Sequence, residues 1–222
     1  MSAKKLTRKQ IKEDTFITTT VKTLEYLKKH QTLLFVGLLV VIVIIAGTGW
    51  ISRSRKQTQA AASAQFSDAL VSFRKGDLAT AEEIFKLISE RYRGVREGVY
   101  AIYFAGNCAL ESGRNTDAIE SFDRYLEAGD RYPFFHDAAM DGKGTALENE
   151  ERYGDAAKVY LELLKDIKTN SFMEKIYLRR AADNLKLSNQ NKRAIEIIQQ
   201  LLEKSTGMDR RDIEIELDLL RG

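Results

Sequence analysis

The side chains that could perform chemistry are few and scattered along this sequence. His30 and His136 lie far apart, and Cys108 is the sole cysteine, so neither a metal site nor an intrachain disulfide is predicted. The carboxylate run at 148–151 is typical of a solvated helix end. The sequence has no glycine-rich loop that could hold a phosphate and no nucleophile beside a partner base. We therefore predict that the protein is not an enzyme and needs no cofactor.

The composition indicates a folded, helix-rich chain. It has 44% hydrophobic and 30% charged residues, a single proline (Pro133), and many alanine, leucine, glutamate, lysine and arginine residues, which favour helices. Residues 1–32 hold eight basic and three acidic side chains, a net +5, whereas the remainder holds 27 basic and 29 acidic ones, a net −2. A folded part that is slightly acidic argues against nucleic-acid binding.

One segment is apolar enough to cross a bilayer. Residues 33–51 form an uncharged run of nineteen, and as a helix they would cover roughly 28 Å, about the thickness of a hydrocarbon core. Trp50 stands at its distal edge, where an aromatic ring favours the interface, and basic residues follow at once. A buried soluble helix usually runs shorter, and a cleaved signal peptide has an apolar region of only ~7–15 residues. We predict a retained transmembrane helix.

The charges on either side of this helix give its orientation. The positive-inside rule places the lysine-rich tail in the cytoplasm and residues 52–222 outside it, although the basic residues nearest the membrane are balanced on the two sides. In the tail, apolar residues around 16–28 recur at helical spacing. They fit either an amphipathic helix lying on anionic lipid or a simple continuation of the span.

Beyond residue 62 the chain repeats itself. An alanine is followed four residues later by a large apolar residue in four places, and the alanines lie 37, 38 and 38 residues apart. Each has a second small residue twelve positions upstream and a turn-forming or polar residue five positions upstream. The alanines with their apolar partners are Ala81/Phe85, Ala118/Phe122, Ala156/Tyr160 and Ala194/Ile198. The upstream small residues are Ala69, Gly106, Gly144 and Ala182, and the turn residues are Gly76, Gly113, Glu151 and Asn189.

This spacing predicts antiparallel helical hairpins. Two helices approach closely only where the facing side chains are small, and the large residue one turn later fills the space beside the crossing. The pattern resembles the tetratricopeptide repeat (TPR), with units three or four residues longer than the common ~34. We expect an all-α fold: a basic cytoplasmic tail (1–32), a transmembrane helix (33–51), a connector (52–62), and an α-solenoid of about four hairpins (63–222). The stretch from Asp209 to Arg221 fits either a strand or, as we prefer at the end of a solenoid, a capping helix.

The resemblance implies a concave surface built from the first helix of each hairpin, where such repeats hold a partner. Its register assigns the inner-wall residues Phe66, Phe73, Tyr103, Asn107, Leu110, Asp141, Thr145, Glu148, Arg179, Asp183 and Lys186. The first half of this wall is aromatic and apolar, and the second half carries both charges. We hypothesise that the apolar end grips a partner's hydrophobic segment while the polar end fixes its orientation. A clamp for a terminal carboxylate is not expected, because only Asn107 and Arg180 fit its positions.

The whole arrangement resembles bacterial inner-membrane proteins of the YfgM type, in architecture more than in motif. That resemblance implies an extracytoplasmic, periplasmic repeat domain that serves protein translocation, with translocon subunits, periplasmic chaperones or unfolded clients as partners. The alternative is a scaffold that recruits subunits of a cell-envelope complex, such as division, secretion or outer-membrane assembly machinery. A cytoplasm-facing adaptor would follow if the orientation were reversed.

Overall fold

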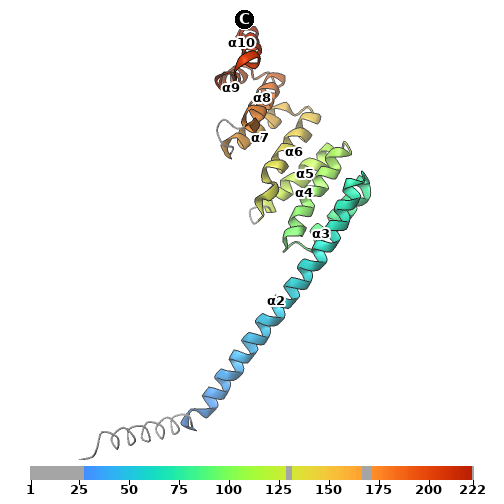
Figure 1. Cartoon of the computed structure of the whole chain (residues 1–222), viewed down its shortest axis with the longest axis vertical. Coiled ribbons are helices and arrows are strands. Elements are labelled where there is room, and N and C mark those ends of the chain that lie inside the picture. Colours follow the sequence, from blue (N-terminus) through green and yellow to red (C-terminus); the bar gives the residue numbers. More distant parts are fainter. Residues whose placement is uncertain (1–27, 129–131, 167–171, 222) are drawn as a thin grey trace, which may run out of the picture. The chain divides into compact units, whose positions relative to one another are not determined.

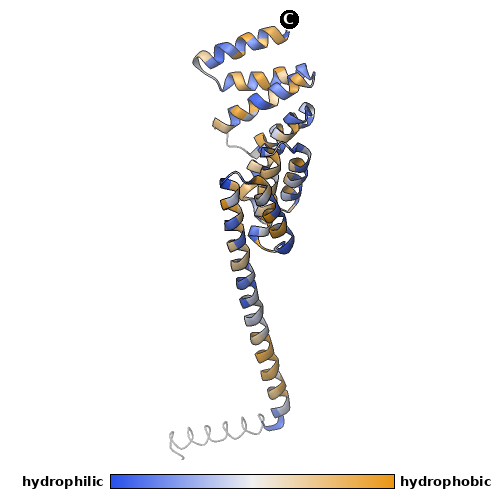
Figure 2. Ribbon diagram, turned by 90° about the vertical axis from the view of Figure 1, so that its right-hand side faces the viewer, coloured by the Kyte–Doolittle hydropathy of each residue, from blue (hydrophilic) through white to orange (hydrophobic). Residues whose placement is uncertain are grey.

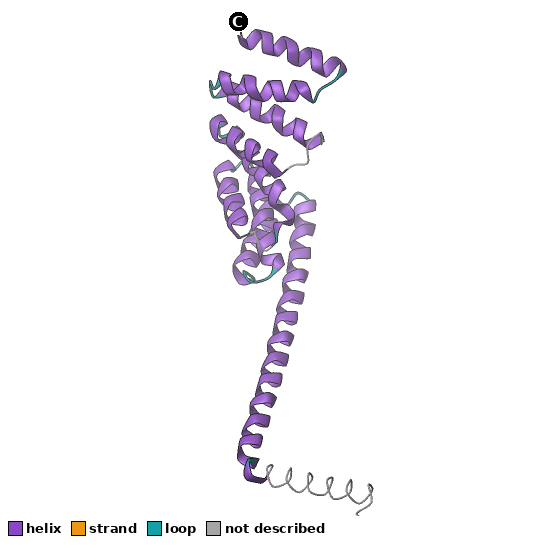
Figure 3. Cartoon of the chain, turned by 90° about the vertical axis from the view of Figure 1, so that its left-hand side faces the viewer, coloured by secondary structure: helices purple, strands orange, loops and turns teal. Residues whose placement is uncertain are grey.

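The structure is a computed structural model that describes residues 28–128, 132–166 and 172–221. Every regular element in these ranges is a helix, with no strand, as Figure 3 shows. The elements are α2 (Gln31–Arg74), α3 (Leu78–Arg91), α4 (Arg96–Glu111), α5 (Asn115–Ala128), the 3-10 helix η2 (Pro133–Phe135), α6 (His136–Asn149), α7 (Tyr153–Asp166), α8 (Phe172–Leu187), α9 (Asn191–Glu203) and α10 (Gly207–Arg221). The all-α prediction is confirmed for these ranges.

The chain divides into two compact units, Met1–Gln57 and Thr58–Gly222. In the first unit, the helical residues from 31 onward form a helix long and apolar enough to cross a membrane, and none of its apolar window is buried. Figure 2 shows this segment as a continuous apolar stretch. The side chains of Leu33 and Trp50 are 74% and 76% exposed. Most of the predicted tail, residues 1–27, lies outside the described residues, and so does nearly all of its possible amphipathic helix.

The predicted connector at 52–62 is helical and forms part of α2. Ala62 is fully buried, and Gln59 and Ser63 hydrogen-bond to the carboxylate of Glu97 on α4. The Ser63 Oγ to Glu97 Oε1 distance is 2.8 Å. The second half of the connector therefore belongs to the first hairpin, because its side chains help to close that hairpin against α4.

In the second unit, the C-terminal part of α2 packs against α3, and the following helices pack in succession from α3 to α10 (Figure 1). The four turns within the hairpins share one geometry. Gly76, Gly113, Glu151 and Asn189 have φ angles of 78°, 73°, 56° and 58°. After each, the next amide donates to a carbonyl five residues back, as from Arg114 to Ala109 (2.9 Å). This is the Schellman pattern, which satisfies the last carbonyls of a helix and needs a left-handed residue.

The helix crossings occur at the predicted small residues. A Cβ on Gly106 would lie 2.9 Å from the ring of Phe122, and Gly142 meets the same ring from α6. Ala69, Ala81 and Phe85 share one buried cluster, and Ala182 shares another with Ile198. Small residues let the backbones approach, and the neighbouring large side chain then fills the gap at crystal-like density.

Helix α10 settles the choice left open for the last segment. Ile213 and Leu217 are each 3% exposed and pack with Leu220 against Leu178, Ile198 and their neighbours. This spacing of four and three residues belongs to one helix face, so the segment is a helix and not a strand.

Candidate partner-binding surface

All eleven residues assigned to the inner wall lie on the first helix of a hairpin. Phe66 and Phe73 lie on α2, and the other nine lie in three groups of three on α4, α6 and α8. All eleven side chains are partly buried and keep some accessible surface. The structure shows very different surroundings for the two halves of the wall.

The first half of the wall is a continuous cluster of aromatic rings. Phe104, which follows Tyr103 on α4, joins them: its ring lies 5.4 Å from Phe66, 5.9 Å from Phe73 and 5.2 Å from Phe85, centroid to centroid. Most of these pairs are edge-to-face, the arrangement that the ring quadrupoles favour. The rings hold the first two hairpins together and leave an apolar surface on their accessible side.

The segment Tyr132–Phe135 continues this aromatic surface. Phe135 stacks on Tyr103 at 4.5 Å and packs edge-on against Tyr100 at 4.8 Å. The buried hydroxyl of Tyr125 holds the backbone of the segment at both ends, donating to the carbonyl of Tyr132 (2.8 Å) and accepting from the amide of Phe135 (3.1 Å). Phe134 is left 78% exposed, with its ring edge-to-face with Phe135 at 4.8 Å and tilted against Tyr100 at 6.4 Å.

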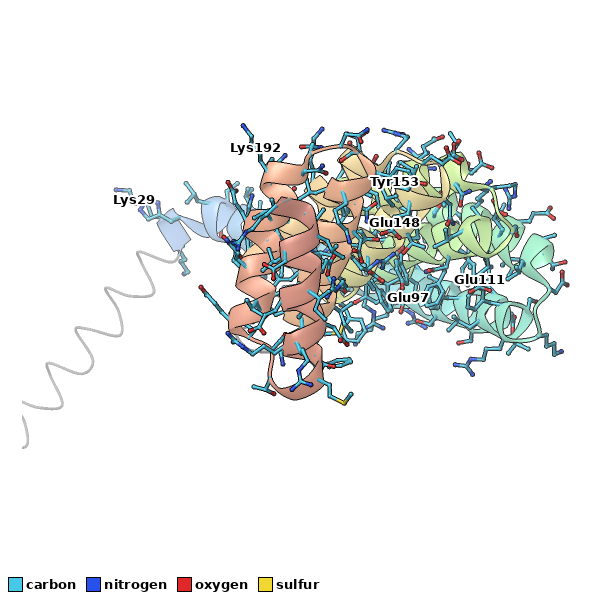
Figure 4. All side chains as sticks on the ribbon, turned by 90° about the horizontal axis from the view of Figure 1, so that it is seen from above. Lys29, Glu97, Glu111, Glu148, Tyr153 and Lys192 are labelled. Atoms are coloured by element: carbon cyan, nitrogen blue, oxygen red, sulfur yellow. The ribbon has the colours of Figure 1, made fainter. Side chains whose placement is uncertain are left out.

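The third group of wall residues surrounds a single arginine. Arg180 of α8 donates to Asp141 (2.8 Å), Thr145 (2.9 Å) and Glu148 (2.5 Å) of α6. Its guanidinium lies 4.4 Å from the centre of the buried Tyr160 ring, a cation–π contact. Figure 4 shows Glu148 among the side chains between the helices, whereas Lys192 points away from them. Because Arg180 is held by three partners, it is not free to clamp a ligand carboxylate.

Burial and neighbouring charges have opposing effects on the pKa of Asp141 in this cluster. Burial raises the pKa of the Asp141 carboxyl, and the nearby charge of Glu148 adds to that effect, although Arg180 opposes it. Arg180 thus forms ion pairs with two carboxylates, those of Asp141 and Glu148. The cluster joins α6 to α8 and fixes how two neighbouring hairpins stack.

The last group of wall residues pairs with α10. Glu216 accepts from Arg179 and from Lys186, each at 2.5 Å, and Lys186 also contacts Asp183 at 2.7 Å. Burial opposes the ionisation of Glu216, but the hydrogen bonds from Lys186 and Arg179 outweigh it and lower the pKa. The charged half of the wall is therefore largely engaged in contacts between helices.

The sequence-based assignment did not include several residues of this surface. Phe104 stands beside Tyr103, and the register of one wall residue per turn left it out. Arg180, beside Arg179, was considered only as a clamp position and was not assigned to the wall. The run Tyr132–Phe135, with the only proline of the chain between aromatic residues, was a visible signal. Glu216 could not be found, because its role depends on where α10 packs.

The described residues include no group of three or more histidine, cysteine, aspartate or glutamate side chains that could hold a metal ion. Cys108 is fully buried among small core residues, and burial raises the pKa of its thiol to about 12. It is therefore a packing residue in a helix crossing, and not a nucleophile.

Comparison with known proteins identifies the fold of the repeat unit. No family model matches the chain, and no curated protein matches its sequence. Two solved structures are similar in fold, both of the nearly identical TPR-like repeats of a putative kinesin light chain from Podosopora anserina. One has a TM-score of 0.55 at 13% identity and covers 73% of this chain and 86% of its own. The other, a variant with one substitution, has a TM-score of 0.53 at 11% identity and covers 64% and 74%.

At these identities the likeness concerns the fold alone and does not extend to the YfgM-type resemblance. The chain thus carries a TPR-like helical array with an aromatic half-wall, on α2 and α4 with Phe134 and Phe135, and a charged half-wall, on α6 and α8.

Proposed function

We propose that the chain is a membrane-anchored protein-binding module. In this proposal residues 33–51 span a membrane, and the repeat unit lies on the extracytoplasmic side, in the periplasm of a bacterium. There it serves as an accessory to protein translocation or to periplasmic chaperones. Two features support the anchor: the length of the apolar segment and the exposure of its side chains all around the helix.

The aromatic half-wall is the observation that carries the binding role. It combines partly exposed rings on α2 and α4 with Phe134, which is 78% exposed. Exposed aromatic surface on a soluble unit is costly to maintain and typically marks an interaction site. The charged groups of the second half of the wall are paired mainly with Arg180 and Glu216, so we assign this half to holding the array together. This narrows the sequence-based hypothesis, in which both halves contacted the partner.

The first experiment places a photo-crosslinking amino acid at Phe134 in the full-length protein and identifies the captured proteins in cells. Lys192, an exposed residue on α9, serves as the matched control position. Translocon subunits, periplasmic chaperones or emerging chains captured from position 134 alone would support the proposal. Equal capture from positions 134 and 192 would show that the aromatic half-wall is not the binding site.

The same experiment separates the accessory role from the envelope scaffold. A scaffold would give one stoichiometric partner from a single envelope complex and would not suppress aggregation of an unfolded substrate. Many weakly captured chains together with such suppression would instead indicate client handling.

The orientation has its own test. Cys108 is buried, so a cysteine placed at Lys192 gives a specific surface label. A membrane-impermeant maleimide should modify it in intact spheroplasts. Labelling only after lysis would place the array in the cytoplasm and would overturn the extracytoplasmic proposal.

A further inference from the structure

A short basic segment follows the apolar run of α2. Arg53, Arg55 and Lys56 begin two residues after Ile51, and we name these three residues the basic collar. All three side chains are exposed, and none forms an ion pair with a residue in 28–128, 132–166 or 172–221. Figure 2 shows the apolar stretch of this helix giving way to hydrophilic residues. Three positive charges thus lie close together without a counterion in the described part of the chain.

The sequence around the collar is free of acidic residues. No aspartate or glutamate occurs between Glu25 and Asp68. Asp68 lies twelve residues beyond Lys56 on the same helix, which is roughly 18 Å along the axis. Charges on a solvated surface are largely screened beyond about 8 Å at physiological ionic strength. The counterions of the collar must therefore come from outside this helix.

The depth of the collar matches one source of negative charge. In the proposed function, on which this inference rests, residues 33–51 span a bilayer. At 1.5 Å per residue, the collar then lies roughly 3–8 Å beyond Ile51. The headgroup layer on each side of the hydrocarbon core is about 5–8 Å thick. Trp50, which is 76% exposed, belongs to a residue type that favours the same boundary. The collar thus falls at the level of the lipid phosphates.

The directions of the three side chains favour lipid over a protein partner. At 3.6 residues per turn, Arg53 and Arg55 leave the helix about 160° apart, and Lys56 lies between them. A partner helix covers one face, so it would not pair with both arginines. A bilayer surface surrounds the helix and presents phosphate to all three side chains. The guanidinium group also matches the geometry of phosphate oxygens.

We propose that the basic collar binds the phosphate groups of anionic phospholipids and enriches these lipids around the end of the span. Basic residues at a membrane surface are attracted by lipids that carry net negative charge, and the attraction falls off within a Debye length. Zwitterionic lipids also carry a phosphate, but their own ammonium group neutralises it. The collar therefore discriminates by net headgroup charge.

Trp50 is the only tryptophan of the chain and reports on the lipids beside the collar. The full-length protein is reconstituted into two bilayers of the same composition, equal parts phosphatidylglycerol and phosphatidylcholine. In one the acyl chains of the phosphatidylglycerol are brominated, and in the other those of the phosphatidylcholine. Bromine quenches tryptophan fluorescence only at close range. Quenching should show that phosphatidylglycerol is preferred at least about threefold beside Trp50. Equal quenching in the two bilayers would overturn the proposal.

Two charge variants make the test specific to the collar. Arg53→Gln/Arg55→Gln/Lys56→Gln should abolish the preference. Lys28→Gln/Lys29→Gln is the control, because these lysines precede Trp50 by 21 or more residues, roughly 32 Å along a helix, and it should keep the preference. All five positions are exposed, and circular dichroism shows whether the variants fold. A preference that survives the triple substitution, or is lost in the control, would contradict the assignment to the collar.

Two further outcomes separate this proposal from its neighbours. An excess of inorganic phosphate at matched ionic strength should leave the preference unchanged, and its loss would show a site for free phosphate instead of lipid. Quenching in neither bilayer would show that residues 33–51 do not insert, which would overturn the anchor and the collar together. Equal quenching, in contrast, would leave the anchor in place and remove only the collar.

Discussion

Gly144 of α6 lies directly against the ring of Tyr160 on α7. A Cβ on Gly144 would lie 2.5 Å from Cζ of Tyr160 and 2.7 Å from its hydroxyl oxygen, closer than such atoms can come. Tyr160 is fully buried, stacked on Tyr177 and covered by Arg180. Because Gly144 has no side chain, α6 and α7 can approach closely enough for the Tyr160 ring to fit between them. That ring in turn supports the guanidinium of Arg180, which joins α6 to α8.

Gly144→Ala should destabilise the repeat unit by about 1–3 kcal/mol, because the new methyl group must displace a ring that has no free space behind it. Gly154→Ala in the next helix is the matched control. Its Cβ would meet nothing nearer than 3.4 Å, so the gain in helix propensity should stabilise by about 0.5–1 kcal/mol. Urea unfolding followed by circular dichroism measures both. Shifts of the same sign would contradict the assigned crossing.

Glu151→Gly should stabilise the fold by roughly 1 kcal/mol. Glu151 has a φ of 56°, and a residue with a Cβ is strained in this left-handed region, where glycine is not. Glu151→Ala separates the backbone effect from the loss of charge, since alanine also removes the carboxylate but keeps the Cβ. If alanine stabilised as much as glycine, the gain would come from charge and not from the turn.

The partly buried ion pair between Glu82 and Arg114 should make stability depend on pH. The hydrogen bond from Arg114 lowers the pKa of Glu82, against the opposing effect of burial. Because the folded-state pKa lies below that of a free glutamate, ionised Glu82 stabilises the fold above the ordinary glutamate range. That contribution is lost as the pH falls through the folded-state pKa.

Glu82→Gln should therefore cost about 1 kcal/mol at pH 7, a modest value because Arg114 is 42% exposed and partly screened. The cost should shrink at acidic pH, where wild-type Glu82 is protonated too. Glu83→Gln, at the exposed neighbouring position, is the control. A cost that stays constant from pH 7 to acid would show that the charge is not responsible.

Cys108 should resist thiol reagents in the folded protein. Its side chain is fully buried, and burial raises the pKa of the thiol to about 12, so neither access nor thiolate is available at pH 8. Ellman's reagent should react with it only after unfolding in urea. Rapid reaction under native conditions would show that the α4 crossing opens readily.

A fragment of residues 52–222 should be soluble, helical and cooperatively folded. It keeps Ala62, Phe66 and Ala69, which pack against α3 and α4 in the first core cluster. A fragment that starts at residue 75 removes this cover and should expose the rings of Phe85 and Phe104. Circular dichroism and thermal melting compare the two. Equal melting temperatures would show that the end of α2 adds nothing to the repeat unit.

The repeat pattern was open to prediction because hairpin packing imposes strict local requirements. A small residue at each crossing, a large one a turn later and a left-handed turn residue between them must recur at fixed spacing, and the structure has all three at the predicted positions. Glu151 illustrates the strength of this signal. Its residue type does not favour the left-handed conformation, and its place in the register predicted the turn correctly.

The sequence by itself therefore determined the helices, their pairing into TPR-like hairpins, and the helix that carries each inner-wall residue. The tertiary structure decided which of those side chains remain available. Arg180 forms ion pairs with Asp141 and Glu148, and Glu216 forms ion pairs with Arg179 and Lys186. Phe135, from a segment about thirty residues later in the sequence, stacks on Tyr103. Helical periodicity places a residue on a face of its own helix, because that depends on local geometry. Whether a side chain on that face meets solvent or a partner depends on contacts between distant segments, and only the packed structure fixes those.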